Sequence, residues 1–160
     1  MSPITQYLPY NNIFNDPIEY QFSSFTDILD QWASIQPDQL AVEFLNKRNN
    51  QQSLTYFELR TKAIKIANFL VSTLPANSHV AIIIEEGIDY LSSFFGCLYA
   101  DMVAVSICGV NVKTNIKTSI QAKHFNAVIG TESFLSTSAI HWPKHIHVFS
   151  VKQLLAANIP

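Results

Sequence analysis

The run IDYLSSFFGCLYADMVAVSI, residues 88–107, most constrains what this chain can fold into. Twenty predominantly apolar residues are long enough to span a bilayer as one helix. However, Asp101 lies well inside the most apolar window, where an aspartate costs about 2.5–3.5 kcal/mol on insertion scales, and Asp89 lies near its start. The run therefore predicts a helix and then a strand, buried one after the other in a soluble core.

The spacing and type of the apolar residues in the run change at Asp101. Before it, apolar residues recur at helical spacing. These are Ile88, Leu91, Phe95 and Leu98, with Phe94 and Tyr99 widening the stripe. After it, VAVSI (103–107) is short and β-branched, as a buried strand should be. We expect a helix from residue 88 to about residue 100 and a strand directly behind it.

The rest of the chain repeats the alternation of helix and strand. Helices are expected at 25–36, 56–73 and 113–123, and a short helix or turn at 132–138. Strands are expected at 40–45, 53–55, 80–84, 126–130 and 146–151, with a hairpin loop at 46–52. Strands separated by helix-length segments indicate parallel β-α-β connections. The predicted fold class is α/β, with alternating helices and strands and a largely parallel sheet.

Two of the expected helices carry capping patterns and apolar faces. Ser24 with Asp27, and Thr55 with Glu58, have the spacing of residues that cap a helix N-terminus. The apolar face of the first helix is Phe25, Ile28, Leu29, Trp32 and Ile35, and that of the second is Leu59, Ala63, Ile66, Ala67, Leu70 and Leu74. The second stripe is expected to pack on a sheet.

Composition excludes several classes of protein. The chain is 48% hydrophobic and 14% charged with a net charge of −2, which gives no electrostatic reason to expect nucleic acid or an anionic membrane as partner. A surface this poor in charge suggests that more chain or a partner covers part of it. The two cysteines, Cys97 and Cys108, are interpreted as buried free thiols of a cytoplasmic protein. The arm at 1–21 is polar and shows no signal-peptide pattern.

The candidate chemical groups are few, and each has a structural explanation. Glu85 and Glu86 follow a predicted strand, where an acidic pair more often complements a helix dipole than acts as acid and base. His145 and His147 would share a face if both lay on a strand, with His141 nearby, but Pro143 interrupts this segment and a zinc site needs further ligands. With four glycines in all, no Gly-rich phosphate loop is present.

Three segments together resemble the N-terminal stretch of the adenylate-forming superfamily, and specifically fatty acyl-AMP ligases. They are a helix ending in QPD (36–38) before a strand, LTYFEL (54–59), which is similar to the pattern L-T-Y-x-E-L, and FFGCLYA (94–100) with VAV two residues after it. The first two are shared across the superfamily, and the third is typical of the fatty acyl-AMP ligase branch. The resemblance runs from about Phe22 to the end of the chain.

The resemblance implies a large α/β N-terminal domain, of which residues 22–160 would be the first part, and a small mobile C-terminal domain. It implies that full-length relatives use ATP and magnesium to convert a fatty acid to an acyl-adenylate, and pass the acyl group to a carrier protein. Their phosphate loop and catalytic lysine would lie beyond Pro160. No catalytic, cofactor-binding or metal-binding residue is therefore assigned here, and the chain alone is expected to be inactive.

The chain departs from the family pattern at two places. Asp101 stands where the family usually has Gly, and Ser106 stands where a Pro usually begins a Pro-rich turn. A non-catalytic alternative remains open beside the enzymatic reading. In that alternative, a stand-alone remnant dimerises or holds a partner through an exposed apolar sheet edge, or binds an apolar ligand without turnover. The partners considered are therefore the remainder of the ligase domain and a second copy of this chain.

Overall fold

The computed structural model describes residues 24–45, 51–84, 87–107, 116, 118, 125–137 and 140–157. The elements in chain order are α2 (Phe25–Ile35), β1 (Leu40–Leu45), β2 (Gln51–Thr55), α3 (Tyr56–Thr73), β3 (His79–Ile83), α4 (Ile88–Tyr99), β4 (Val103–Ser106), β5 (Ala127–Gly130), α6 (Glu132–Thr137), β6 (His147–Ser150) and α7 (Val151–Ala156). The predicted arm at 1–21 lies outside the described residues, as does most of the predicted helix at 113–123.

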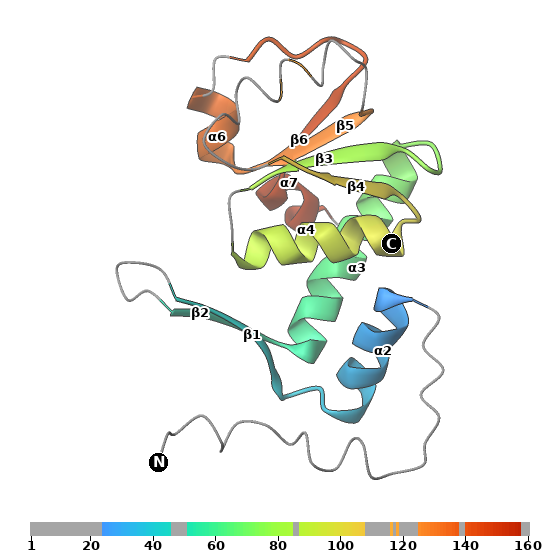
Figure 1. The fold of residues 1–160 in the computed structure, drawn as a ribbon, viewed down its shortest axis with the longest axis vertical. Helices are drawn as coiled ribbons and strands as arrows, with labels where there is room; N and C mark the ends of the chain where they lie inside the picture. Colours follow the sequence, from blue (N-terminus) through green and yellow to red (C-terminus); the bar gives the residue numbers. More distant parts are fainter. Residues whose placement is uncertain are drawn as a thin grey trace.

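The central sheet is parallel, which confirms the predicted α/β class. Its strand order is β4-β3-β5-β6, and all three neighbouring pairs run parallel. The strands β1 and β2 form a separate antiparallel pair, which Figure 1 shows projecting away from the parallel sheet. This hairpin was predicted with a loop that is two residues too long, because Gln51 and Gln52 pair with Leu45 and Phe44.

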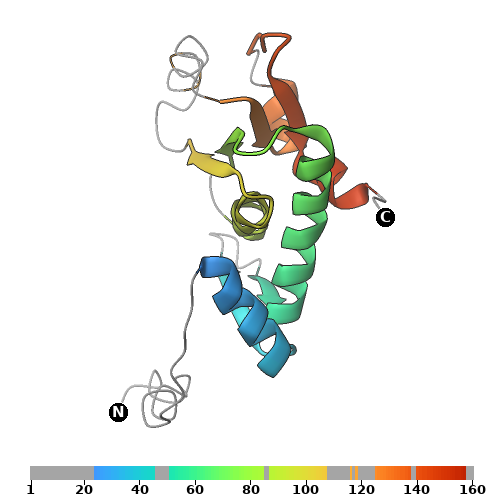
Figure 2. The ribbon, with the colours of Figure 1, turned by 90° about the vertical axis from the view of Figure 1, so that its right-hand side faces the viewer.

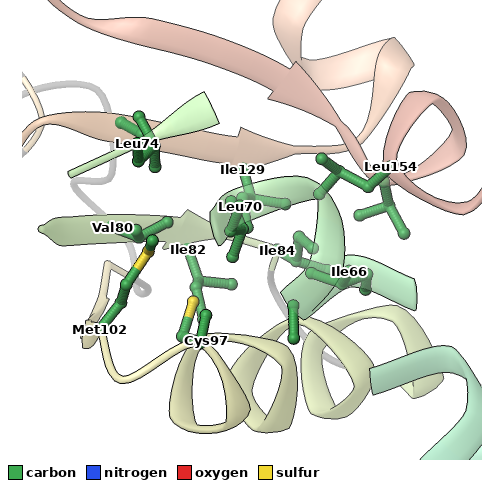
Figure 3. Packing of buried hydrophobic residues seen from close by; sticks show 14 residues of the cluster. Ile66, Leu70, Leu74, Val80, Ile82, Ile84, Cys97, Met102, Ile129 and Leu154 are labelled. Carbon is green, nitrogen blue, oxygen red and sulfur yellow. The ribbon is translucent and has the colours of Figure 1, made fainter. Parts of the chain in front are cut away.

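Each face of the parallel sheet is buried. Val80 and Ile82 of β3 belong to a cluster with residues of α3, α4 and α7, whereas Ala81 and Ile83 belong to a cluster on the opposite face. Both faces of β3 are therefore buried, as is typical of a central strand in a parallel sheet. Figure 3 shows the first cluster, in which Leu70 of α3 lies close to Ile82.

Helix α3 joins the two sheets. Its predicted stripe from Leu59 to Leu74 is buried throughout, which confirms that prediction. Leu59, near the beginning of the helix, packs with Leu54 of the hairpin, whereas Ile66, Leu70 and Leu74 pack against the parallel sheet. Figure 2, in which α4 is seen nearly end-on, shows α3 extending past both α2 and the sheet. Because α4 also contacts both the hairpin and the parallel sheet, the relative position of the two depends on α3 and α4.

The face that α4 buries differs from the predicted one. The most buried residues include Ser92, Ser93, Gly96 and Cys97, whereas Leu91, Phe95 and Leu98 are only half-buried. The physical reason is the close approach of α3. A Cβ atom on Gly96 would lie 2.5 Å from Cγ2 of Ile66, so only small side chains fit between the two helices.

The predicted apolar face of α2 is also only partly buried. Leu29 is buried, but Phe25 and Ile35, at the two ends of the helix, are 69% and 60% exposed. The reason is that α2 packs on α3 and α4 at the margin of the structure and lies on neither face of the parallel sheet. Within the described ranges, no helix has the length and apolar character needed to cross a membrane; the run at 88–107 folds as α4 followed by β4.

Candidate functional site

The carboxyl edge of the parallel sheet is where ligands usually bind in α/β folds. Side chains of the chain itself cap the N-termini of α6 and α7 at this edge. Thr131 Oγ1 accepts a 3.2 Å hydrogen bond from the backbone N–H of Phe134, and Ser150 Oγ accepts one of 3.2 Å from Gln153. The third helix, α4, begins after Gly87 without a side-chain cap. Glu85 and Glu86, which precede Gly87, lie outside the described residues.

The condition under which His145 and His147 would share a strand face is not met. His147 is the first residue of β6, but His145 lies in the turn before the strand, after Pro143. The His147 ring stacks on Phe149 at 6.0 Å, and His141 and His145 are exposed. The described residues contain no group of three or more His, Cys, Asp or Glu side chains placed to hold a metal ion.

Cys97 is a packing residue and not a nucleophile. Its side chain is fully buried among Ile82, Leu70 and their neighbours (Figure 3), and it forms no disulfide. Burial raises the pKa of the Cys97 thiol from 9.0 to about 12, so the reactive thiolate is absent at neutral pH. Cys108 lies outside the described residues.

An apolar cavity lies between α2, β1, α3 and α4. Its volume is about 240 Å³, and its walls include Phe25, Leu29, Trp32, Val42, Tyr56 and Phe95. The Trp32 and Tyr56 rings stack with centroids 5.8 Å apart. Among the described residues, no carboxylate, amine or imidazole lines the cavity, so these walls are suited to binding apolar groups. Sequence reasoning missed this cavity, because the apolar face of α2 was assigned entirely to the core.

Asp30, Arg60 and Tyr99 form a polar network beside this cavity. Arg60 Nε donates a 2.5 Å hydrogen bond to Asp30 Oδ1, and Tyr99 donates one of 2.6 Å to the same oxygen. Partial burial, followed by the hydrogen bond to Asp30, raises the pKa of Tyr99 above its usual range. The hydrogen bond to Asp30 also raises the pKa of Arg60. The three side chains satisfy one another's hydrogen bonds. The network therefore joins α2, α3 and α4, and none of its three groups is left as a free acid or base.

The parallel four-stranded sheet, with clusters of side chains on both faces, is the fold of an adenylate-forming enzyme domain. It superposes on the crystal structure of fatty acid AMP ligase from Legionella pneumophila with a TM-score of 0.74, covering 82% of this chain and 24% of that chain at 22% identity. In sequence, residues 29–149 match the AMP-binding enzyme family. The chain belongs to this family, as the resemblance noted in its sequence implies.

Two curated relatives refine the comparison. The medium-chain-fatty-acid–acyl-carrier-protein ligase JamA of Moorena producens is 34% identical over 86 residues, which are 53% of this chain and 14% of the relative. The long-chain-fatty-acid–AMP ligase FadD32 of Mycolicibacterium smegmatis is 29% identical over 107 residues, which are 62% of this chain and 17% of the relative. The chain thus spans less than a fifth of the length of either ligase.

The segments that carry the resemblance have structural roles. In LTYFEL, Thr55 and Glu58 form a reciprocal capping box at the start of α3, with bonds of 3.2 and 2.9 Å, and Leu54 and Leu59 are buried. In FFGCLYA, Gly96 permits the contact between α3 and α4. Thr55, Glu58 and Gly96 thus maintain the fold, whereas Tyr56, Leu59 and Phe95 of the same segments line the apolar cavity.

Proposed function

We propose that this chain supplies part of the domain with which a fatty acyl-AMP ligase converts a fatty acid and ATP to an acyl-adenylate, and that it does not catalyse this reaction alone. The observation that carries the proposal is the family match over residues 29–149, together with curated relatives that are fatty-acid ligases. Adenylate formation converts a carboxylate oxygen, a poor leaving group, into a good one. The carrier protein that receives the acyl group is a partner of the complete ligase in this proposal.

The described residues do not fit ATP phosphates or magnesium. They contain no cluster of three acidic, histidine or cysteine side chains, and Thr131 and Ser150 already cap the N-termini of α6 and α7 at the carboxyl edge. A nucleotide site needs converging backbone N–H groups or cations, and a magnesium site needs carboxylate oxygens. We therefore place the contacts to nucleotide and metal outside the described residues and derive no catalytic step through them.

Fatty-acid-dependent release of pyrophosphate tests the proposal. The purified chain is supplied with ATP, magnesium and a medium-chain fatty acid, and JamA serves as the positive control. We expect no release above the level without fatty acid. Release of pyrophosphate by this chain at a rate that saturates with fatty acid would contradict the proposal that the chain does not catalyse the reaction alone.

A second candidate function, binding of an apolar ligand without turnover, is favoured by the cavity between α2 and α3. Its volume of about 240 Å³ exceeds the roughly 150 Å³ of an engineered cavity that binds benzene. Trp32 lines the cavity, so a Trp142→Phe variant carries its remaining tryptophan there. Saturable change of its emission with octanoate would support this candidate, and an unchanged spectrum would reject it.

A further inference from the structure

We propose that the apolar cavity between α2, β1, α3 and α4 binds a compact, uncharged aromatic molecule of about two fused rings. The inference rests on the second candidate function above and deepens it, because it names the class of apolar ligand that the cavity takes. Three properties of the cavity carry it, namely its aromatic walls, the absence of charged side chains from its described walls, and its volume.

Aromatic side chains from three helices line the cavity. Four of its ten lining residues carry rings, and these are Phe25 and Trp32 of α2, Tyr56 of α3 and Phe95 of α4. The Trp32 and Tyr56 rings stack with centroids 5.8 Å apart and planes at 23°, and the Phe95 ring meets Phe94 edge to face at 5.8 Å. A ligand ring can stack on such rings or meet them edge to face. Each aromatic pair strengthens binding by about two- to tenfold beyond the burial of apolar area alone.

The described walls of the cavity carry no charged group. The only polar side-chain atoms among the lining residues are Nε1 of Trp32 and the hydroxyl oxygen of Tyr56. The polar network beside the cavity supplies no free counterion, since Arg60 bonds Asp30 Oδ1 at 2.5 Å and Tyr99 bonds the same oxygen at 2.6 Å. Burying an ionised group without a partner is costly, so an ionised ligand must leave its charge in water. The cavity therefore favours an uncharged ligand.

The volume of the cavity favours a compact ligand. At about 240 Å³ it exceeds the roughly 150 Å³ that accommodates benzene, which leaves room for about one further fused ring. A flexible alkyl chain also fits this volume, but it loses internal rotational freedom on binding, whereas a rigid ring system has almost none to lose. A fused aromatic ligand thus gains both from ring contacts and from a smaller entropic cost.

Contacts outside the cavity walls hold the bordering elements in place. Asp30 joins α2 to Arg60 of α3 and to Tyr99 of α4. The first turn of α3 is tied to the segment between α2 and β1, because the Tyr56 N–H donates a 3.0 Å bond to the Gln39 carbonyl. A ligand that enters a cavity bordered in this way does not have to order the helices first, which lowers the cost of binding.

A comparison of two uncharged probes tests the inference. Quinoline has two fused aromatic rings and is uncharged at neutral pH, and hexanol is a flexible chain of similar hydrophobicity. The indole N–H signal of Trp32 reports binding in NMR spectra, and the Trp142→Phe variant identifies it, since the chain has two tryptophans. We expect quinoline to bind at least about fivefold more tightly than hexanol, and hexanoate to bind more weakly than hexanol. Hexanol binding as tightly as quinoline would overturn the inference.

Substitution of one lining ring tests whether aromatic contacts are the cause. Phe95→Leu removes a ring from the walls and keeps an apolar side chain there. Phe94→Leu is the matched control, because Phe94 is the neighbouring half-buried residue of α4 and is not among the described walls. Phe95→Leu should weaken quinoline binding about threefold or more and change hexanol binding less than about twofold, whereas Phe94→Leu should change neither. Equal weakening of both ligands by Phe95→Leu, or equal effects of the two variants, would contradict the inference.

The outcomes separate this inference from the second candidate function. If hexanol and octanoate shift the Trp32 signal and bind at least as tightly as quinoline, an apolar ligand site is present but the aromatic ligand class is wrong. If none of the probes shifts the signal, the second candidate function is rejected and the inference with it. If Phe95→Leu unfolds the chain, the comparison of quinoline with hexanol in the unsubstituted cavity still decides.

Discussion

The hydroxyl of Tyr99 donates a 2.6 Å hydrogen bond to Asp30 Oδ1, although the two residues are 69 positions apart in the chain. The same oxygen accepts a bond from Arg60 Nε at 2.5 Å. One carboxylate oxygen thus joins α2, α3 and α4, the three helices that border the apolar cavity together with β1. The orientation of α2, and with it the shape of the cavity, depends on this contact.

Replacing Tyr99 with phenylalanine should lower the free energy of unfolding by about 1–2 kcal/mol, because a hydrogen bond to a charged acceptor is lost in a partly buried position. Chemical denaturation measures the change. Tyr90→Phe is the matched control on the same helix, since its hydroxyl bonds Ser106 Oγ at 3.1 Å in an exposed position. The Tyr90→Phe substitution should cost less than about 0.5 kcal/mol. Equal losses of stability in the two variants would show that the hydrogen bond to Asp30 stabilises the protein no more than the exposed one to Ser106.

The same hydrogen bond should make stability fall at high pH. Burial and Asp30 raise the pKa of Tyr99 in the folded protein above its ordinary value of 10.0. The contribution of Tyr99 is therefore fully present below pH 10 and is lost as the pH rises through the folded pKa. The stability difference between wild type and Tyr99→Phe should shrink from pH 9 to pH 11. Cys97, whose pKa is also raised, is present in both proteins and cancels. A difference independent of pH would contradict this explanation.

Features of the fold that depend on neighbours in sequence could be predicted from the sequence. The Thr55–Glu58 capping box, the stripe of α3 and the parallel sheet all follow from local spacing, and the structure confirms them. The buried face of α4 could not be predicted, because hydrophobicity favoured Leu91 and Phe95 whereas the close approach of Ile66 selected Gly96. The Asp30–Arg60–Tyr99 network and the cavity have no local signal, since both arise only when distant helices pack together.

Replacing Gly96 with alanine should lower the free energy of unfolding by about 1–3 kcal/mol, the usual cost of overpacking. The new Cβ atom would lie 2.5 Å from Cγ2 and 2.8 Å from Cβ of Ile66, so α3 and α4 must move apart. A double-mutant cycle with Ile66→Ala measures the coupling. Gly96→Ala should cost less in that background, because one of the two clashing atoms is gone; the same cost in both backgrounds would show that the contact with Ile66 is not the cause.

Substitution by alanine should change the stability of the protein differently at two adjacent serines of α4. Ser92 and Ser93 are both fully buried, but Ser93 Oγ donates a 2.7 Å bond to the Asp89 carbonyl, whereas Ser92 Oγ has no hydrogen-bond partner in the described structure. Ser92→Ala should raise stability by about 1 kcal/mol, because an unsatisfied buried hydroxyl is removed. Ser93→Ala should be neutral or destabilising. Both substitutions raise helix propensity by the same amount. Equal effects in chemical denaturation would therefore contradict the explanation that the Ser92 hydroxyl lacks a hydrogen-bond partner in the described structure.

Replacing Asp101 with glycine should stabilise the protein, although it removes a polar side chain from the surface. Asp101 has φ 54°, a left-handed conformation in which a Cβ atom is strained. It ends α4 in a Schellman motif, because its N–H bonds the Leu98 carbonyl at 3.1 Å and the Met102 N–H bonds that of Cys97 at 2.9 Å. A glycine, which the resemblance to fatty acyl-AMP ligases implies at this position, would adopt this conformation without strain.

The expected gain for Asp101→Gly is about 0.5–1 kcal/mol, or roughly 1–4 °C in Tm for a chain of this size. Asp89→Gly is the matched control, because it makes the same chemical change in the first turn of the same helix. There the backbone is helical and the carboxylate lies near the positive end of the helix dipole, so glycine should cost about 1 kcal/mol. Opposite signs for the two substitutions in thermal unfolding would identify backbone strain at the end of α4 as the cause; a loss of stability at both positions would show that the Asp101 carboxylate makes a contribution greater than the strain.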